Sequence, residues 1–330
     1  MLPISLLDLA PIADGTSLAD AFENSRQLAI AAEKNGYQRI WLAEHHGMLG
    51  VASSATSLVL AHIAAATNTI RIGSGGVMLP NHSPLVIAEQ FGTLETLFPG
   101  RVDLGLGRAP GTDMATARAL RRKLHSDVDD YPDDIIELQR YLGTPAAGQK
   151  TIAVPGANTH VPLWLLGSSL YSAQLAASLG LPYSYASHFA PDQLFDAIEV
   201  YRSTFKPSQQ CDKPYMMAGV MAVVADTDEE AKYLFTSVQQ QFMNLRHGLN
   251  RRFAKPVDDL SQICSDADQA MLSSILRYAA VGSKQTVSDK LEQFVKATKA
   301  DELIVSMPIH NNDARLKSVK LLAETGLVMQ

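Results

Sequence analysis

The sequence predicts an α/β protein built as one (β/α)8 TIM barrel, and three observations support this. Strand-like and helix-like segments alternate along the chain, which is the pattern of a parallel sheet with helical crossovers. The alternation gives eight strands in 330 residues, which fits a barrel of roughly 250 residues with insertions. The turn after the first strand lacks the glycine-rich pattern of a doubly wound nucleotide-binding sheet. We therefore expect a single domain over residues 1–330, with insertions at about 143–162 and 248–281.

The eight strands are predicted from short apolar and β-branched runs bounded by turn residues. The third run is interrupted by Gly73, Gly75 and Gly76, which weaken a regular strand there. The fourth follows the turn formed by Pro99 and Gly100. In chain order the predicted strands are residues 4–9, 39–43, 70–79, 101–107, 163–166, 183–186, 215–224 and 302–306.

The helices are predicted from apolar residues at helical spacing, together with end signals. Gly36 ends the first helix, and Thr227 or Asp226 caps a long helix with Glu229 and Glu230 in its first turn. A break near residue 129 divides the region 115–142, whereas 145–162 and 248–269 look irregular. The predicted helices are residues 17–35, 53–67, 84–98, 115–142, 170–179, 192–205, 227–247, 270–281, 287–298 and 313–324.

Composition excludes several classes of function. With 28 Lys+Arg against 34 Asp+Glu the net charge is −6, which makes nucleic acid an unsuitable partner. The longest nearly uninterrupted apolar stretch, residues 215–225, is too short for a membrane span, and the first twelve residues lack the basic region of a signal peptide. We therefore expect a globular, cytoplasmic protein without a membrane segment.

The start of the helix after the fifth strand offers a site for an anion. In such a barrel the active site is built at the carboxyl ends of the strands. There, Gly167, Ser168 and Ser169 bring backbone N–H groups and hydroxyls to a positive helix end, which suits a phosphate. Arg108, at the end of the fourth strand, could reach the same anion with a forked pair of donors. The alternatives are simple capping by either serine and an Arg108 ion pair with Asp113.

His45 and His46 follow the second strand and are the candidate acid or base. Neighbouring residues on an extended segment point in opposite directions, so the two cannot normally share one metal ion. No third ligand at suitable spacing is visible in the sequence, and we expect no metal. One histidine is expected to face the barrel mouth, while the other packs against or caps the loop. A purely structural role for both remains the alternative.

Glycines late in two strands leave room for a flat ligand. Gly75 and Gly76 give either a wall without side chains or a strained or cis peptide, with a simple bulge as the alternative. Gly105 and Gly107 follow a fourth strand and not a first one, so they are a weak dinucleotide signal. We interpret them as space beside a ring system.

Several longer motifs resemble the bacterial luciferase-like flavin monooxygenases. They are WLAEHH at residues 41–46, GSGGVMLP at 73–80 and PGRVDLGLGR at 99–108, with VGS at 281–283 and ADEL at 300–303 near the other end. The resemblance thus covers nearly the whole chain. Within the family, the chain resembles luciferase-like monooxygenases of unassigned substrate more than the light-emitting subunits.

This resemblance implies an oxidoreductase that binds reduced FMN (FMNH2), supplied by a separate flavin reductase. It would use O2 to form a flavin C4a-peroxide that oxygenates a small organic substrate, and it would be a homodimer. We expect the dimer to form through residues 53–67 and 84–98, because small residues there would let helices approach closely; packing on the barrel wall is the alternative. These small residues are Ala55, Ala61, Ala64, Ala65 and Ala66. The resemblance also implies roles for single residues: His45 as acid or base, Arg108 at the flavin phosphate, Gly167, Ser168 and Ser169 around that phosphate, and a cis peptide between Gly75 and Gly76 facing the isoalloxazine.

Departures from the family pattern limit what the resemblance implies. Gly107 stands where light-emitting members carry a cysteine, and the two serines lack an adjacent glutamate, so aldehyde bioluminescence is not expected. Two other functions stay open: deazaflavin-dependent hydride transfer, with Arg251 and Arg252 as candidates for the longer anionic tail, and a catalytically silent flavin-binding protein. We also expect residues 248–269 to form a lid over the barrel mouth.

Overall fold

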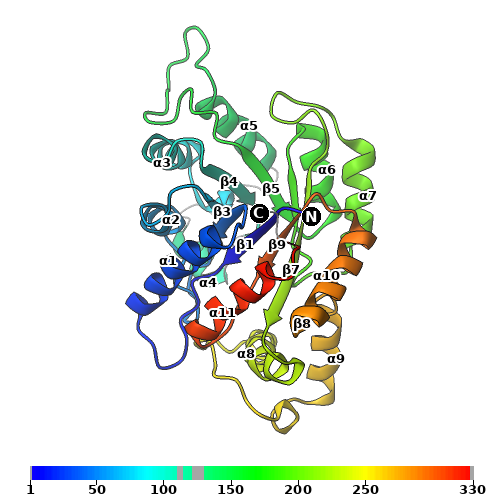
Figure 1. Cartoon of the computed structure of the whole chain (residues 1–330). Helices are drawn as coiled ribbons and strands as arrows, with labels where there is room; N and C mark the ends of the chain where they lie inside the picture. Colours follow the sequence, from blue (N-terminus) through cyan, green and yellow to red (C-terminus); the bar gives the residue numbers. More distant parts are fainter. Residues whose placement is uncertain (1, 110–113, 121–129, 328–330) are drawn as a thin grey trace.

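The computed structural model describes residues 2–109, 114–120 and 130–327, and it confirms a closed barrel (Figure 1). Eight parallel strands hydrogen-bond in the order β6-β5-β4-β3-β2-β1-β9-β7, and pairing between β6 and β7 closes the ring. The backbone of Leu2 donates to the carbonyl of Leu327, so the two ends of the described chain lie side by side. The barrel strands are β1 (Ile4–Asp8), β2 (Arg39–Leu42), β3 (Arg71–Met78), β4 (Val102–Gly107), β5 (Leu163–Gly167), β6 (Tyr183–Tyr185), β7 (Met216–Val224) and β9 (Glu302–Ser306).

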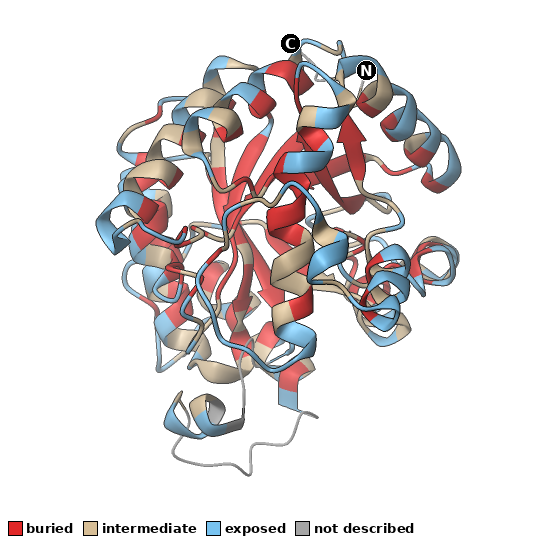
Figure 2. Cartoon of the chain, turned by 90° about the horizontal axis from the view of Figure 1, so that it is seen from below, coloured by how far each residue is buried: buried red, intermediate tan, exposed pale blue. Residues whose placement is uncertain are grey.

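Helices surround the strands, so the strands are buried on both faces, as Figure 2 shows by their red colour. The Ser17 side chain caps the first helix and forms a capping box with Asp20, which explains why that helix begins where the sequence predicts it. The helices are α1 (Leu18–Lys34), α2 (Thr56–Ala64), α3 (Pro84–Leu97), α4 (Met114–Leu120), α5 (Tyr131–Leu142), α6 (Leu170–Leu179), α7 (Leu194–Thr204), α8 (Asp228–Arg246), α9 (Asp266–Ile275), α10 (Lys284–Thr298) and α11 (Asn312–Ala323), with short 3-10 turns η1 (Leu79–Asn81) and η3 (Leu260–Gln262).

The amino-terminal ends of the strands are joined by a buried ionic network. The guanidinium of Arg39 contacts Asp103 at 2.6 Å and Glu302 at 2.8 Å, and Arg71 also contacts Asp103 at 2.5 Å. These charges are paired and hydrogen-bonded, which is the condition for burying them. The network therefore closes the floor of the barrel and leaves the opposite end free for chemistry.

The predicted helix over 270–281 is correct only for residues 270–275. The capping box of Ser265 with Asp268 starts α9 earlier, inside the segment expected to be irregular. The helix ends at Ile275, and β8 (Ala280–Gly282) then pairs in parallel with residues 222–224 of β7. This pairing is a long-range contact that overrides the local helical pattern. The strand lies outside the closed ring, near α8 and α9 (Figure 1).

The two irregular segments differ in their packing. Residues 143–162 project beyond α3 and α5 (Figure 1). Their base touches α3, where the backbone of Gly156 lies so close to Gly92 that an added Cβ on Gly92 would collide with it. Residues 250–253 instead pack on loops that follow β1 and β2, as described below. The expected break near residue 129 lies outside the described residues. Within them, no helix combines the length and apolar character needed to cross a membrane.

Candidate functional site

A cavity of about 520 Å³ opens at the carboxyl ends of the strands. Its lining is mostly apolar, as is usual for small-molecule sites. Eight residues that the sequence analysis assigned to the site belong to this lining: His45, Gly75, Gly76, Gly107, Arg108, Gly167, Ser168 and Ser169. Gly105, which was also interpreted as space beside a ring, is not part of it. The structure thus brings together residues from β2, β3, β4 and β5 that are spread over 125 positions of the chain.

One wall of the cavity is formed by bare backbone. The peptide bond between Gly75 and Gly76 is cis, as the resemblance implied, and the pairing of β3 with β4 shifts register there. A Cβ on Gly75 would lie 2.7 Å from the side chain of Leu7, and one on Gly76 would lie 2.8 Å from the carbonyl of Gly105. The backbone of Gly105 therefore excludes a side chain at Gly76, while one at Gly75 would have to displace Leu7, and the bare wall can accept a flat ring.

Another part of the lining is suited to an anion. Ser169 caps α6, since its hydroxyl accepts from the amide of Ser172, so the capping alternative is observed. Ser168, Ser169 and Ser172 line the cavity, so the amino-terminal end of α6 lies at its border. The guanidinium of Arg108 stacks on Tyr171 of α6, 4.3 Å from the ring centroid. The alternative partner of Arg108, Asp113, lies outside the described residues.

His45 and His46 separate as the extended backbone requires. His45 lines the cavity, whereas Nε2 of His46 lies 2.8 Å from Oε1 of Glu44. His82, from the segment after β3, contacts the same oxygen at 2.8 Å, and the amide of Met78 donates to the other oxygen. The carboxylate, only 2% exposed, thus holds the loop after β2 against the segment after β3.

The pKa of Glu44 shows that this cluster favours a charged carboxylate. Burial raises the pKa, but the hydrogen bonds and charge of His82, with the hydrogen bonds from His46 and the amide of Met78, outweigh it, so the pKa lies below its usual value of 4.5. Sequence reasoning missed His82, which lies 36 residues beyond His46 and which no local spacing rule would pair with it. Contrary to the sequence analysis, three potential ligand atoms lie close enough to hold an ion. All three side chains are, however, joined by the hydrogen bonds just described.

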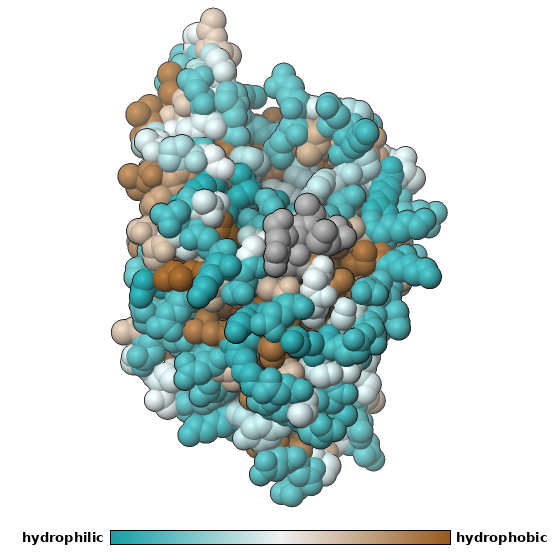
Figure 3. Space-filling view, viewed as in Figure 1, coloured by the Kyte–Doolittle hydropathy of each residue, from teal (hydrophilic) through white to brown (hydrophobic). Residues whose placement is uncertain are grey.

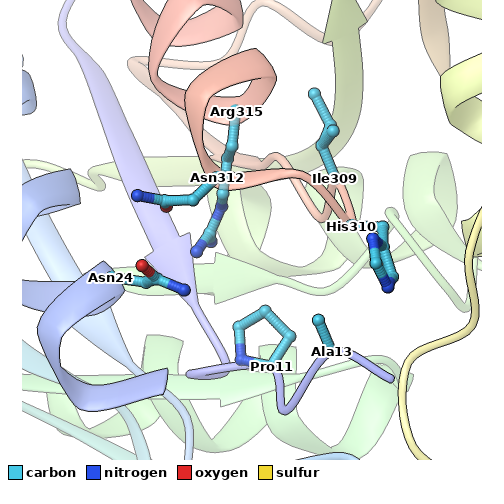
Figure 4. A pocket seen from close by; sticks show the side chains of 7 residues that line it. All are labelled: Pro11, Ala13, Asn24, Ile309, His310, Asn312 and Arg315. Atoms are coloured by element: carbon cyan, nitrogen blue, oxygen red, sulfur yellow. The ribbon is translucent and has the colours of Figure 1, made fainter. Parts of the chain in front are cut away.

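Arg315 was also missed, and it borders both the main cavity and a smaller hollow (Figure 4). Its Nη2 contacts the buried Asp8 at 2.7 Å, and its Nε donates to the carbonyl of Met307. Figure 4 shows the guanidinium pointing from α11 toward Pro11 and Asn24. The charge of Arg315 is therefore paired inside the protein and serves to fix α11 on the end of β1.

α8 contributes a face that the sequence analysis did not assign to the site. Val238, Gln241, Phe242 and Leu245, spaced at one helical face, all line the cavity. His188, which follows β6, also lines the cavity, and burial lowers the pKa of this histidine to about 4, so it is neutral near pH 7.

The start of the expected lid is attached to the barrel mouth. The side chain of Asn250 donates to the carbonyl of Gly47 and accepts from the amide of Leu49, at 2.6 and 2.7 Å. Phe253 is buried and lines the cavity, while Arg252 donates to the carbonyl of Thr16. Neither Arg251 nor Arg252 belongs to the described lining, so neither is placed for a cofactor tail.

Comparisons with known proteins agree with this geometry. A family model described as luciferase-like monooxygenase matches residues 3–301. A luciferase-like monooxygenase of Escherichia coli K12 is 51% identical over 317 residues, covering 96% of this chain and 95% of that protein. The crystal structure of apo-MsnO8 is 34% identical with a TM-score of 0.88, covering 100% of this chain and 99% of the other.

The fold is also shared by more distant structures. The oxygenating constituent of 3,6-diketocamphane monooxygenase from Pseudomonas putida, in complex with FMN, is 18% identical with a TM-score of 0.72, covering 99% of both chains. An F420-dependent secondary alcohol dehydrogenase is 15% identical with a TM-score of 0.67, covering 98% of both. On the family match and the two nearer relatives, this chain belongs to the luciferase-like monooxygenase family and is a flavin-dependent oxidoreductase.

Proposed function

We propose that the protein is a monooxygenase that uses reduced FMN and O2 to oxidise a small organic substrate. One observation carries this proposal: a single cavity joins a bare glycine wall to an arginine and a helix amino terminus. A ring system with a phosphate tail fits these two features, because the wall accepts a plane and the helix end accepts an anion.

The fit of FMN is supported at both of its ends. At the phosphate end, Arg108 supplies charge, while Ser168 and the first amides of α6 supply hydrogen-bond donors. At the ring end, Gly75 and Gly76 border the cavity without side chains, and the neighbouring Leu7 and Gly105 leave little room for a Cβ at either position. A bound flavin would supply the electrons that activate O2 for transfer of one oxygen atom to the substrate.

We assign His45 as the group that gives or takes a proton beside the flavin. It lines the cavity, whereas the neighbouring His46 is held by Glu44. The clamp formed by Glu44, His46 and His82 fixes the loop that carries His45, so its role is to position that ring. The largely apolar lining keeps bulk water from the reacting atoms.

We also propose a homodimer through α2 and α3 and a separate flavin reductase. Leu58 of α2 is 72% exposed, Leu97 of α3 is 61% exposed and Val86 of α3 is 44% exposed. Figure 3 shows apolar residues gathered along the left edge, where Figure 1 places α3. An exposed apolar patch of this kind is typical of a protein interface. Ala64, expected to favour close helix approach, instead packs in the barrel core.

Deazaflavin-dependent hydride transfer is the second candidate, because an F420-dependent enzyme shares the fold. Titrating the protein with FMN, FMNH2 and the deazaflavin, by flavin fluorescence, separates the two. We expect FMNH2 to bind and a reductase with NADH to support O2-dependent product formation. Tighter binding of the deazaflavin, with no oxygen incorporated into any product, would overturn the proposal. Flavin binding without any turnover would indicate the silent flavin-binding protein instead.

A further inference from the structure

We infer that the organic substrate is an uncharged, largely apolar molecule with one polar group, which hydrogen-bonds the side-chain amide of Gln241. The inference rests on the proposed function and names the substrate class for the same cavity. The inference is carried by a set of cavity-lining residues from α8 and its neighbours. We call the part of the cavity that these residues form the substrate chamber.

Apart from Gln241, the residues that form the substrate chamber are apolar. Along α8 the lining residues recur at helical spacing, so one continuous strip of the helix faces inward. Leu245, at the end of this strip, is 48% exposed, which places it at the mouth. The residues of the substrate chamber are Val238, Gln241, Phe242 and Leu245 of α8, with Met48, Val51, Met221 and Phe253.

No counter-charge for an ionic substrate is found in the described lining. It contains no aspartate, glutamate or lysine, and its two arginines are already assigned. Arg108 belongs to the phosphate end, and Arg315 is paired with Asp8. Burying a carboxylate, sulfonate or ammonium in such surroundings costs much of its hydration energy without compensation. The described part of the lining thus favours neutral substrates over charged ones.

Gln241 is the polar exception within this apolar strip. Its Oε1 is buried and has no hydrogen-bond partner among the described residues. A buried amide oxygen without a partner is costly, so such atoms in binding sites are commonly satisfied by the ligand. The neutral His188 has an unpartnered Nδ1 too, but that atom lies against Gly219 and not toward the chamber. Gln241 is therefore the residue that orients the substrate's polar group.

Calorimetric titration of the FMN-loaded protein with four eight-carbon probes tests this inference. Octan-1-ol, octanoate, octylammonium and octane-1-sulfonate share one chain and differ in the charge of the head group. We expect octan-1-ol to bind and each ion to bind at least about tenfold more weakly. Equal or tighter binding of any ion, or no binding of the alcohol, would overturn the inference.

Two variants test the role of the amide. Gln241→Leu should weaken octan-1-ol binding about fivefold to tenfold, whereas Gln239→Leu, on the same helix but outside the lining, should leave it unchanged. Thermal unfolding checks that both variants are folded. The comparison of the four probes uses the natural protein, so it does not depend on the folding of either variant. Unchanged affinity in Gln241→Leu would remove Gln241 from the substrate site. Flavin fluorescence measures FMN binding separately, so failure of the proposed function is distinguishable from failure of this inference.

Discussion

Replacing Arg108 by alanine should weaken FMN binding about tenfold. A hydrogen bond to a charged group contributes roughly 1.5–3 kcal/mol. Arg108 is exposed to solvent, which screens its charge, so we take the lower end, and about 1.4 kcal/mol corresponds to a factor of ten. The stacking on Tyr171 holds the guanidinium over the start of α6, so little freedom is lost when the phosphate binds.

Riboflavin provides the matched control, because it has the same ring as FMN and lacks the phosphate. Fluorescence titration of the natural protein and of Arg108→Ala with both ligands gives a four-way comparison. We expect the variant to lose affinity for FMN while its affinity for riboflavin stays the same. An equal loss for both ligands would show that Arg108 acts on the ring or on the fold, and no loss for FMN would refute the phosphate site.

Four further outcomes follow from the geometry. His45→Ala should retain FMNH2 binding and lower oxygenation roughly a hundredfold, measured by oxygen incorporation; a comparable loss in His46→Ala with unchanged stability would reverse the two roles. Glu44→Gln should lower the free energy of unfolding by about 2 kcal/mol at pH 7, measured by urea denaturation. Because the pKa of Glu44 is depressed, this stabilisation is present above pH 4.5 and is lost as pH falls through the folded pKa, so the two curves should converge in acid. Parallel curves would show that the charge of Glu44 is not the cause. Leu58→Glu should shift the protein toward monomer in sedimentation, and an unchanged mass would place the interface elsewhere. Asn250→Ala should keep FMN affinity but raise the fraction of turnover released as hydrogen peroxide, and an unchanged fraction would remove the lid role of residues 250–253.

The barrel could be predicted from sequence because its signals are local. Each barrel strand is a short apolar run, and several helices carry both their apolar spacing and a side-chain cap within a few residues, as the box of Ser17 and Asp20 shows. β8 could not be predicted, since residues 280–282 become a strand only by pairing with β7. The missed α9 cap at Ser265 is different, because that signal was present locally in the sequence.

The candidate site was predictable where backbone geometry places residues at strand ends. His45, Arg108 and Ser169 all follow barrel strands, so their meeting in one cavity follows from the fold itself. Glu44 and His82 could not be paired in advance, because their contact joins the ends of β2 and β3 through side chains alone.

The glutamines at 239, 240 and 241 show what sequence reasoning lacks at the substrate end. The three are chemically identical neighbours, and a helical period separates them by about 100° each. The packing of α8 determines what each side chain contacts. Nε2 of Gln240 donates to the carbonyl of Lys255 at 2.8 Å, while Gln241 lines the cavity. The direction of that face is set by contacts of α8 with β7, which precedes it in the chain, and with β8, which lies far from it in the sequence. In the proposed function, the choice of substrate therefore depends on how α8 packs against the barrel. The flavin site depends instead on strand ends, which the barrel pattern of the sequence already defines.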